Sequence, residues 1–423
     1  MEKMTSRERV RKAINHQVSD RVPIDFGATT VSNIHVAEAS ALRQKLPIEQ
    51  KLTKAVDPLL MASLVEPDMR DALEIDCIGV WGKSTSIGVR NDGFKPFTLP
   101  SGTQILVCDG FEYDIDDDGA VWAYAQGNRN YPPSAKMPSD GLYFDPVARQ
   151  EDLSAKTEWN ARKDYKDMYS VFTDAELREF EDEATDLYNN TQCALVGTVN
   201  GSLGDAFHVP GPWLTESPGI RDMKDWFMGF YQHPDYIKEL FEMHTEIAME
   251  NFKLYWQAVG DKVDIMFLSA VDFAYQEGLM ISPKIYRKFF APCFKKMTDW
   301  IHENTTWKTL IHSCGSVIDL IPDIIDSGFD ILNPVQISAK GMSPAVLKEK
   351  FGKDIVFWGG ACDPQTVLVH GTPEEVYDEV KKNAAIFAKD GGYVGGNVHN
   401  VQCDVPVENL LAEIRALKDT IPE

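Results

Sequence analysis

The second half of the chain alternates between amphipathic stretches with a helical period and short apolar runs. The period predicts amphipathic helices over residues 174–189, 234–258, 283–304, 318–327, 344–351 and 373–390. Each helix is followed by an apolar run typical of a buried strand, and these runs cover residues 194–199, 264–268, 309–312, 330–333, 355–358 and 392–395. The helix–strand unit therefore occurs six times, as expected for a parallel sheet covered by helices.

The first part of the chain adds one helix and two strands to this pattern. The segment from Thr5 to His16 is amphipathic, and Thr5 and Glu8 have the spacing of a capping box. Apolar runs at 21–26 and 78–80 predict two more buried strands, which brings the expected number to eight. Eight strands in this pattern predict a (β/α)8 TIM barrel of the α/β class. A doubly wound open sheet is the alternative, although no G-x-G-x-x-G motif follows the first strand.

Residues 93–145 interrupt the alternation. Short apolar runs there, such as 104–107 and 120–124, are separated by turns rich in glycine and aspartate, which predicts antiparallel hairpins. The run 116–119 (Asp-Asp-Asp-Gly) lacks the spacing of an EF-hand loop, so a hairpin turn is favoured over a calcium site. We therefore expect a single barrel over residues 1–423, with an inserted antiparallel β-subdomain at 93–145.

Polar residues follow the predicted strands at the points where they end. They are Asp25, Asn200, Asp272, His312, Cys314, Asn333, Gln336, Cys362, Asp363, His399 and Cys403. In a barrel, the carboxyl ends of all strands meet at one face, and the loops there carry the chemistry. The sequence thus predicts that these scattered residues converge in one site.

His312 and Cys314 are the strongest candidates for metal ligands. Residues i and i+2 of a strand point to the same side, so the imidazole and the thiol would project together. Cys403 is the candidate for a third ligand, and three protein ligands leave the fourth position of a catalytic zinc site open. The alternative is that His-x-Cys arises by chance and that Gly315 only marks a turn.

Two further candidates surround this predicted metal site. Cys362 competes for the role of a ligand, and a fourth protein ligand would make a closed structural site. We favour three ligands with Cys362 nearby. Asp272 and Gln276 either contact substrate and orient a ligand, or serve only as a helix cap and a loop residue.

The composition narrows the function. The chain of 423 residues has 43% hydrophobic residues and a net charge of −23, which indicates a globular protein and argues against a nucleic-acid partner. It has seven cysteines, and no apolar signal segment precedes the first predicted helix, so a disulfide framework is not expected. No apolar stretch has the length of a membrane span. We therefore expect a cytoplasmic protein that binds neither nucleic acid nor membrane.

Several motifs together resemble the uroporphyrinogen decarboxylase superfamily. The matching stretches are 5–10 (TSRERV), 20–23 (DRVP), 281–283 (ISP), 312–316 (HSCGS), 330–336 (DILNPVQ) and 405–409 (VPVEN). The resemblance covers nearly the whole chain and implies a (β/α)8 barrel. The decarboxylases of this superfamily grip a tetrapyrrole with arginines near the N-terminus, but the corresponding segment here, 25–30 (DFGATT), has none. The other branch consists of zinc methyltransferases whose His-x-Cys…Cys pattern is similar to His312, Cys314 and Cys403.

The resemblance to that branch implies an activity. It is similar to methyltransferases of O-demethylase systems, which pass a methyl group from a methoxylated aromatic compound to the cob(I)alamin of a partner corrinoid protein, with zinc as Lewis acid. We take as catalytic candidates Asp272, Gln336 and His399, and as cofactor-binding candidates Asn333, Gln276 and Tyr275. A homodimer is one expected assembly. The alternatives are methyl transfer from methylcobalamin to a thiol or to tetrahydrofolate, decarboxylation of uroporphyrinogen type, and a non-enzymatic corrinoid-binding module.

Overall fold

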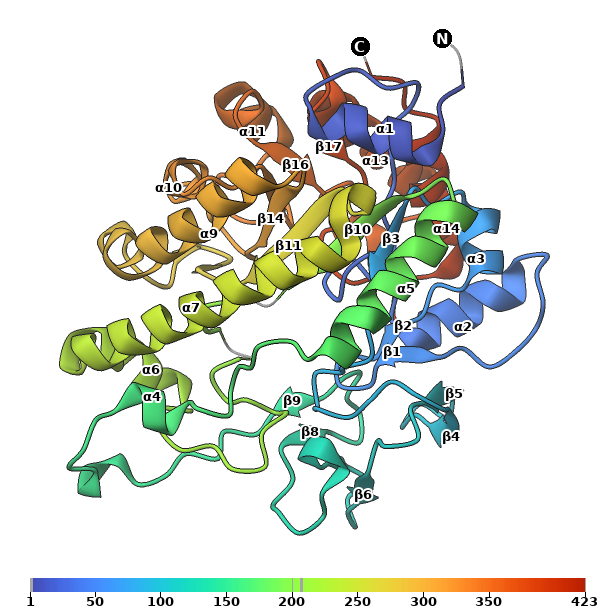
Figure 1. Ribbon diagram of the computed structural model, residues 1–423. Coiled ribbons are helices and arrows are strands. Elements are labelled where there is room, and N and C mark those ends of the chain that lie inside the picture. Colours follow the sequence, from blue (N-terminus) through green and yellow to red (C-terminus); the bar gives the residue numbers. More distant parts are fainter. Residues whose placement is uncertain (1–2, 200, 206–207, 423) are drawn as a thin grey trace.

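A computed structural model describes residues 3–199, 201–205 and 208–422. Its centre is a sheet of seven parallel strands whose neighbours follow the order of the chain (Figure 1). The strands are β3 (Cys77–Val80), β10 (Ala194–Thr198), β11 (Ile265–Ala270), β14 (Lys308–His312), β15 (Ile331–Asn333), β16 (Val356–Trp358) and β17 (Tyr393–Val394). A doubly wound sheet reverses its strand order at one point. This order has no reversal among the described residues and is compatible with a TIM-barrel-like fold.

Residues 23–25 connect the two edge strands of this sheet. Gly395, directly after β17, exchanges hydrogen bonds of 2.8 and 2.9 Å with this segment, and the Asp76 N–H, directly before β3, donates to the Ile24 carbonyl at 2.9 Å. The strand predicted at 21–26 is reduced to an isolated parallel bridge at Ile24. Pro23 has no N–H to donate, and the N–H of Ile24 donates to the Asp76 carboxylate at 2.8 Å. A side-chain hydrogen bond therefore takes the place of a backbone bond between strands.

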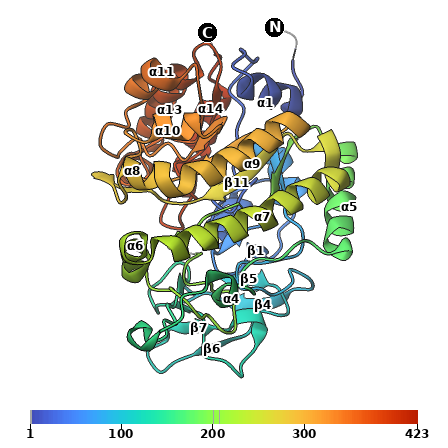
Figure 2. The same cartoon turned by 60° about the vertical axis from the view of Figure 1, so that its left-hand side comes forward.

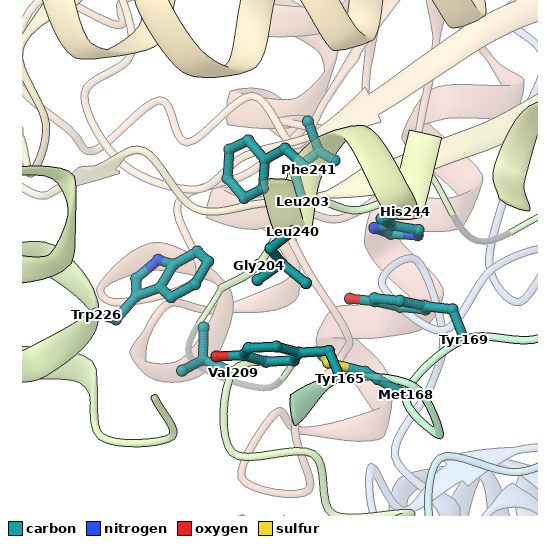
Figure 3. A pocket seen from close by; sticks show the side chains of 10 residues that line it. All are labelled: Tyr165, Met168, Tyr169, Leu203, Gly204, Val209, Trp226, Leu240, Phe241 and His244. Atoms are coloured by element: carbon teal, nitrogen blue, oxygen red, sulfur yellow. The ribbon is translucent and has the colours of Figure 1, made fainter. Parts of the chain in front are cut away.

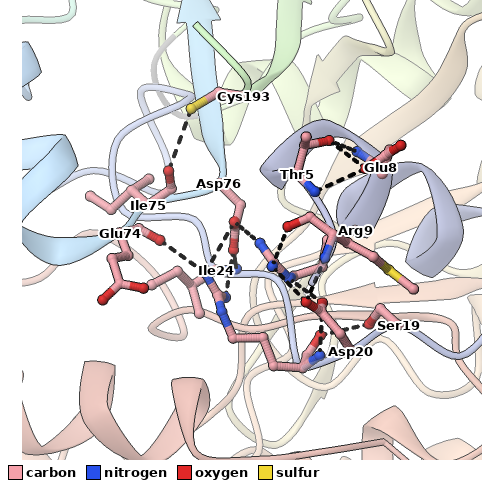
Figure 4. A network of polar contacts seen from close by, with 12 residues as sticks. Thr5, Glu8, Arg9, Ser19, Asp20, Ile24, Glu74, Ile75, Asp76 and Cys193 are labelled. Carbon is pink, nitrogen blue, oxygen red and sulfur yellow. Dashed lines mark hydrogen bonds and ion pairs between the residues drawn. The ribbon is translucent and has the colours of Figure 1, made fainter. Parts of the chain in front are cut away.

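Buried ion pairs reinforce this connection at the amino end of the sheet (Figure 4). The Arg9 side chain, only 4% exposed, lies 2.6 Å from the Asp20 carboxylate and 2.7 Å from that of Asp76. Arg21 adds a second guanidinium at 2.7 Å from Asp76. Every charge in this network has an oppositely charged partner, so its burial is compensated.

Side chains of the sheet alternate between two cores, as expected for strands buried on both faces. One set packs against the surrounding helices, for example Met266 and Leu268. The other set forms an inner core that includes Ile265, Phe267, Leu310, Ile331, Val356 and Val394. Val10, Ala13 and Ile14 of the first helix join this inner core and cover it from the amino end.

Helices surround the sheet: most of the longer ones cover its outer face, and α1 covers the inner core at the amino end (Figures 1 and 2). They are α1 (Ser6–Ile14), α2 (Val36–Lys45), α3 (Pro67–Leu73), α4 (Ala161–Asp164), α5 (Asp174–Asn190), α6 (Met223–Gln232), α7 (Pro234–Val259), α8 (Pro283–Ile285), α9 (Ala291–Asn304), α10 (Ile321–Asp326), α11 (Pro344–Phe351), α12 (Val367–His370), α13 (Pro373–Ala388) and α14 (Val407–Lys418). The capping box of Thr5 and Glu8 at the start of α1 is confirmed. No helix among the described residues is long and apolar enough to cross a bilayer.

The helix predicted over 283–304 is not continuous. A π-helical turn, Tyr286–Phe290, separates α8 from α9. Pro292 follows this turn and has no N–H for the carbonyl four residues earlier, so the regular ladder is broken here. The turn brings Phe289 and Phe290 into one aromatic cluster with Phe230, at ring-centroid distances of 5.1 and 5.6 Å.

Antiparallel strands gather at the end of the molecule opposite the termini (Figure 1). They comprise a hairpin of β4 (Lys95–Thr98) and β5 (Gln104–Val107), and a sheet of β6 (Tyr113–Ile115), β7 (Val121–Ala123), β8 (Ala135–Met137) and β9 (Asp145–Pro146). A third small pair, β1 (Ala55–Asp57) and β2 (Ala62–Ser63), lies beside β5. These strands share a core of their own that contains Phe97, Phe111 and Phe144. Whether 93–145 forms a separate subdomain stays a prediction.

Candidate functional site

His312 is the last residue of β14 and lies at the carboxyl end of the sheet. Leu310 belongs to the inner core, so His312, two residues later, points to the same inner side. The ring is buried, with 3% exposure. Its Nδ1 donates to the Asn333 side-chain oxygen at 2.6 Å, and the Asn333 amide donates to the Trp358 carbonyl at 3.1 Å. Because Nδ1 carries the proton, Nε2 offers a lone pair, which is the orientation found in metal-binding histidines.

The Cys314 sulfur lies on the Nε2 side of this ring. The Sγ–Nε2 distance is 3.4 Å. Zinc bonds of about 2.3 Å to sulfur and about 2.0 Å to nitrogen, meeting at a tetrahedral angle, would separate these atoms by about 3.5 Å. The backbone N–H of Cys314 donates to Asp272 Oδ1 at 2.7 Å, which fixes the position of the loop.

His399 completes a group of three donors. One ligand atom from each of His312, Cys314 and His399 lies within 4.8 Å of the others. Among the described residues, this is the one group of three side chains placed closely enough to hold a metal ion. The two imidazole rings are perpendicular, with centroids 5.0 Å apart. Unlike His312, the His399 ring accepts at Nδ1, from the Asn400 N–H at 2.7 Å, so its Nε2 carries the proton of the neutral ring.

Burial keeps both rings neutral. It lowers the pKa of His312 to about 4 and, with the neighbouring His312 as the second cause, that of His399 to about 3. The pKa of the Cys314 thiol is raised, first by burial and then by the carboxylates of Asp272 and Asp205. Neutral imidazole is the form that binds metal, whereas the thiol would have to lose its proton.

The two other cysteine candidates lie elsewhere. Cys403 is half-buried and is not part of the three-donor group, and burial, Asp404 and Glu38 raise its pKa. Cys362 is fully buried in the core beneath the helices, where burial and then Glu413 raise its pKa. The structure thus brings His399, expected as a catalytic residue, to the position for which the sequence suggested Cys403. Ligation by Cys403 stays a prediction.

One carboxylate, Asp272, contacts the three-donor group, and a second, Asp205, acts on it electrostatically. Asp272 accepts from the Cys314 N–H, as described, and its Oδ1 lies 3.9 Å from His312 Nε2. Asp205 was missed by the sequence analysis, although it follows β10 at the same end of the sheet; Asn200 was chosen there, and it lies outside the described residues. Asp205 contributes to the raised pKa of Cys314 and of Asp272. The signal that could have found it is its place after a predicted strand.

A hairpin formed by β12 (Ala274–Tyr275) and β13 (Gly278–Leu279) supports the cysteine loop. The Ser316 N–H donates to the Tyr275 carbonyl at 2.9 Å. Gly315, with φ +86°, lies so close that a Cβ there would meet the Ala274 carbonyl oxygen at 2.7 Å. The loop therefore requires glycine at this position and depends on the hairpin for its shape.

Two predicted glutamines link the hairpin to the loop. Gln336 accepts the Gly315 N–H at 2.8 Å and donates to the Gln276 side chain at 2.6 Å. Gln276 in turn donates to the Ser338 carbonyl at 3.1 Å. Gln336 therefore acts on the three-donor group through the Gly315 backbone, and Gln276 acts through Gln336. Tyr275, 55% exposed at the hairpin, bonds the loop with its backbone carbonyl.

A small cavity lined by aromatic residues adjoins the segment that carries Asp205 (Figure 3). Its volume is about 10 Å³, room for about one water molecule. The lining includes Tyr165, Tyr169, Trp226, Phe241, His244 and the chain at Leu203 and Gly204. The rings of Tyr169 and His244 stack at 3.5 Å. The cavity is apolar apart from the hydroxyl and imidazole groups at its wall.

Parallel strands in barrel order, with histidine and cysteine donors together at their carboxyl ends, define an α/β protein of the barrel-enzyme type with a candidate site at that end. The uroporphyrinogen decarboxylase (URO-D) family profile matches residues 207–420, half of the chain, and the chain belongs to this family.

Comparison with solved structures supports the same fold. A methyltransferase from Methanosarcina mazei superposes with a TM-score of 0.56 at 16% sequence identity, over 98% of each chain. An endo-glycoceramidase II from a Rhodococcus species, solved as a lactosyl-enzyme intermediate, gives a TM-score of 0.28 at 12% identity over 56% of this chain and 62% of its own, and carries no argument. No curated protein matches the sequence. At 16% identity, the likeness to the methyltransferase supports the fold alone.

Proposed function

We propose that this protein transfers a methyl group from a methoxylated aromatic compound to the cob(I)alamin of a partner corrinoid protein. The observation that carries the proposal is the convergence of His312, Cys314 and His399 at the carboxyl end of the sheet. Membership of the URO-D family and the fold shared with a methyltransferase support it. Unlike a decarboxylase of tetrapyrroles, this chain has no arginine in residues 25–30.

The donor atoms fit zinc. A thiolate and imidazole nitrogens are ligands that zinc prefers, and the 3.4 Å separation of Cys314 Sγ and His312 Nε2 suits a shared ion. His312 and Cys314 would hold it, with the third ligand from His399 or Cys403. When bound, zinc would act as a Lewis acid that stabilises the charge on the departing phenolate oxygen.

The other residues of the site position these donors. Asn333 holds the His312 ring in one tautomer, and Asp272 and Gln336 hold the consecutive amides of Cys314 and Gly315. His399 has one of two roles. It is the third ligand if it gives up the bond from Asn400; otherwise its Nε2–H donates a hydrogen bond to the leaving oxygen.

The decisive experiment is elemental analysis of the purified protein beside Cys314→Ala, His399→Ala and Cys403→Ala. We expect about one zinc per chain in the wild type and none in Cys314→Ala, because a ligand is lost. Loss of zinc in only one of the other two variants identifies the third ligand. Cys293→Ala, a half-buried cysteine on α9, is the control and should keep its metal.

The same proteins are then assayed for methyl transfer from 2-methoxyphenol to free cob(I)alamin, followed by the absorbance of the corrinoid. Cys314→Ala should lose at least a hundredfold in rate, since even residues that only orient a ligand cost about 10–100-fold. Full zinc in Cys314→Ala, or undiminished transfer by metal-free protein, would overturn the proposal.

A further inference from the structure

We propose that Arg149 and Arg221 form a binding site for one small inorganic anion, of the class of chloride, beside the aromatic cavity. The site is built on the segment 209–221, which lies between β10 and α6. It is separate from the three-donor group and does not depend on the proposed function.

Arg221 is the buried part of this site. It is 1% exposed, and its guanidinium carbon lies 4.4 Å from the centre of the Tyr165 ring. Its Nε donates to the Pro218 carbonyl at 2.9 Å and its Nη1 to the Val209 carbonyl at 3.3 Å. Its Nη2 donates to no acceptor among the described residues. One nitrogen of this guanidinium is therefore left for a ligand.

Arg149 places a second guanidinium on the same turn of the chain. Its Nη2 donates to the Gly211 carbonyl at 3.0 Å and its Nη1 to the Thr215 carbonyl at 3.1 Å. A Cβ on Gly211 would come within 3.2 Å of Arg221 Nη1, so both cations adjoin this glycine. The Arg149 Nε is buried and has no acceptor in the described part of the chain. Burial, followed by the charge of Arg221, lowers the pKa of Arg149 to about 10.

Neither guanidinium forms an ion pair with a carboxylate of the described residues. Two carboxylates of this region, Glu151 and Asp164, lie 3.0 and 3.1 Å from the Lys156 ammonium and pair with it instead. Asp222 caps α6 by accepting the Lys224 N–H at 2.9 Å. Backbone carbonyls alone therefore offset two neighbouring positive charges. An anion between them would reduce their repulsion and accept from the donors that lack a partner.

The aromatic cavity limits the size of the ligand (Figure 3). Three residues that line this cavity also contact the Arg221 guanidinium, and they are Tyr165, Met168 and Val209. The cavity volume of about 10 Å³ is room for about one water molecule. A monatomic anion suits this space, whereas sulfate, phosphate and an aromatic carboxylate are too large.

The first test is thermal unfolding of the wild-type protein in sodium chloride and in sodium gluconate at equal ionic strength, so that general screening is the same. A ligand that binds only the folded state stabilises it as the ligand concentration rises. For a chain of this length, we expect Tm to rise by about 3 °C when chloride reaches about a hundred times its dissociation constant. Sodium bromide should act as sodium chloride does.

A variant and a crystal then locate the ion. Arg149→Met removes the charge and the Nε donor of the more accessible arginine, so the rise in Tm with chloride should disappear. Arg162→Met, at an exposed arginine that pairs with Glu246 at 3.0 Å, is the control and should keep the rise. Crystals of the wild-type protein grown in sodium bromide should show anomalous density in contact with both Arg149 and Arg221.

Two results would overturn this inference. One is the same rise in Tm with chloride in Arg149→Met as in the wild type. The other is the lack of anomalous density at the two arginines, which would show that the carbonyls alone suffice. The crystal result needs no variant, so it decides the question even if Arg149→Met fails to fold. Neither result bears on zinc content or methyl transfer.

Discussion

Polar groups at the two ends of the parallel sheet differ in their charged partners. At the amino end, Arg9 lies between Asp20 and Asp76, and the bond from Arg9 holds the pKa of Asp20 below its usual value although burial opposes this. At the carboxyl end, His312 is buried and Cys314 partly buried, with the Asp272 carboxylate 3.9 Å from His312 Nε2, and burial shifts the pKa of each donor toward its neutral form.

The amino end of the sheet therefore contributes to stability, whereas the carboxyl end holds the groups proposed for the chemistry. Charge pairs at the amino end are compensated and tie helix α1, residues 23–25 and β3 together. The groups at the carboxyl end cost free energy in the folded state, which a bound metal can recover. Barrel enzymes generally carry their active sites at the carboxyl end. Three changes would break or sharpen the comparison.

The largest effect is expected from Arg9→Leu. The change leaves Asp20 and Asp76 buried with less compensation, so we expect a loss of about 3–5 kcal/mol in the free energy of unfolding. Urea unfolding measures it. Lys45→Ala removes a charge from the exposed pair of Lys45 and Glu408 and should cost less than about 1 kcal/mol. Equal losses of unfolding free energy in both variants would contradict the larger contribution expected from the buried ion pairs.

The second change concerns Glu413 on α14, a buried carboxylate at neither end. Both of its oxygens lack a hydrogen-bond partner in the described part of the chain, and burial, followed by Glu379, raises its pKa to about 8. The folded state thus keeps a proton that the unfolded state releases near pH 4.5. The stabilising contribution is complete below that pH and is lost as the pH rises toward 8.

Glu413→Gln should therefore gain stability relative to the wild type as the pH rises. Between pH 5 and pH 8 we expect a relative gain of about 2–4 kcal/mol, from 1.36 kcal/mol per pKa unit. Denaturant unfolding at both pH values measures it, with the exposed Glu374→Gln as control. A constant difference between the variant and the wild type would show that Glu413 is ionised throughout.

The smallest effect is expected from Gln336→Leu at the carboxyl end. The Gly315 N–H loses its acceptor, and Gln276 loses a donor. Methyl transfer should fall about tenfold while the zinc content stays near that of the wild type, since neither glutamine is a ligand. Gln365→Leu, which removes only an exposed partner of Gln276, should leave the rate unchanged. Loss of zinc in Gln336→Leu would contradict a purely orienting role.

Periodicity predicted the regular part of the fold because each helix and strand has its own apolar pattern. The helix at 344–351 and the strand at 309–312 were placed to within one residue. The strand at 21–26 failed because the Asp76 side chain takes the place of a ladder partner, which no local pattern reveals. The π-helical turn before Pro292 was missed for a similar reason, since it satisfies tertiary packing of Phe289 and Phe290.

The candidate donors could be predicted from the sequence where they are close in it and not where they are distant. His312 and Cys314 share one strand end, so their spacing alone brought them together. The choice between His399 and Cys403 depends on the path of the loop after β17, and the sequence does not determine that path. Asp205 was overlooked because a carboxylate that acts over a distance has no motif.

The close approach of Gly315 to the Ala274 carbonyl has a consequence for redesign. A side chain at residue 315 would need both a left-handed backbone and space that the hairpin occupies. The segment 312–316 and the hairpin 274–279 would therefore have to be transferred together into another protein. A graft of the histidine and cysteine into another barrel would carry over the donors without their geometry unless the hairpin went with them.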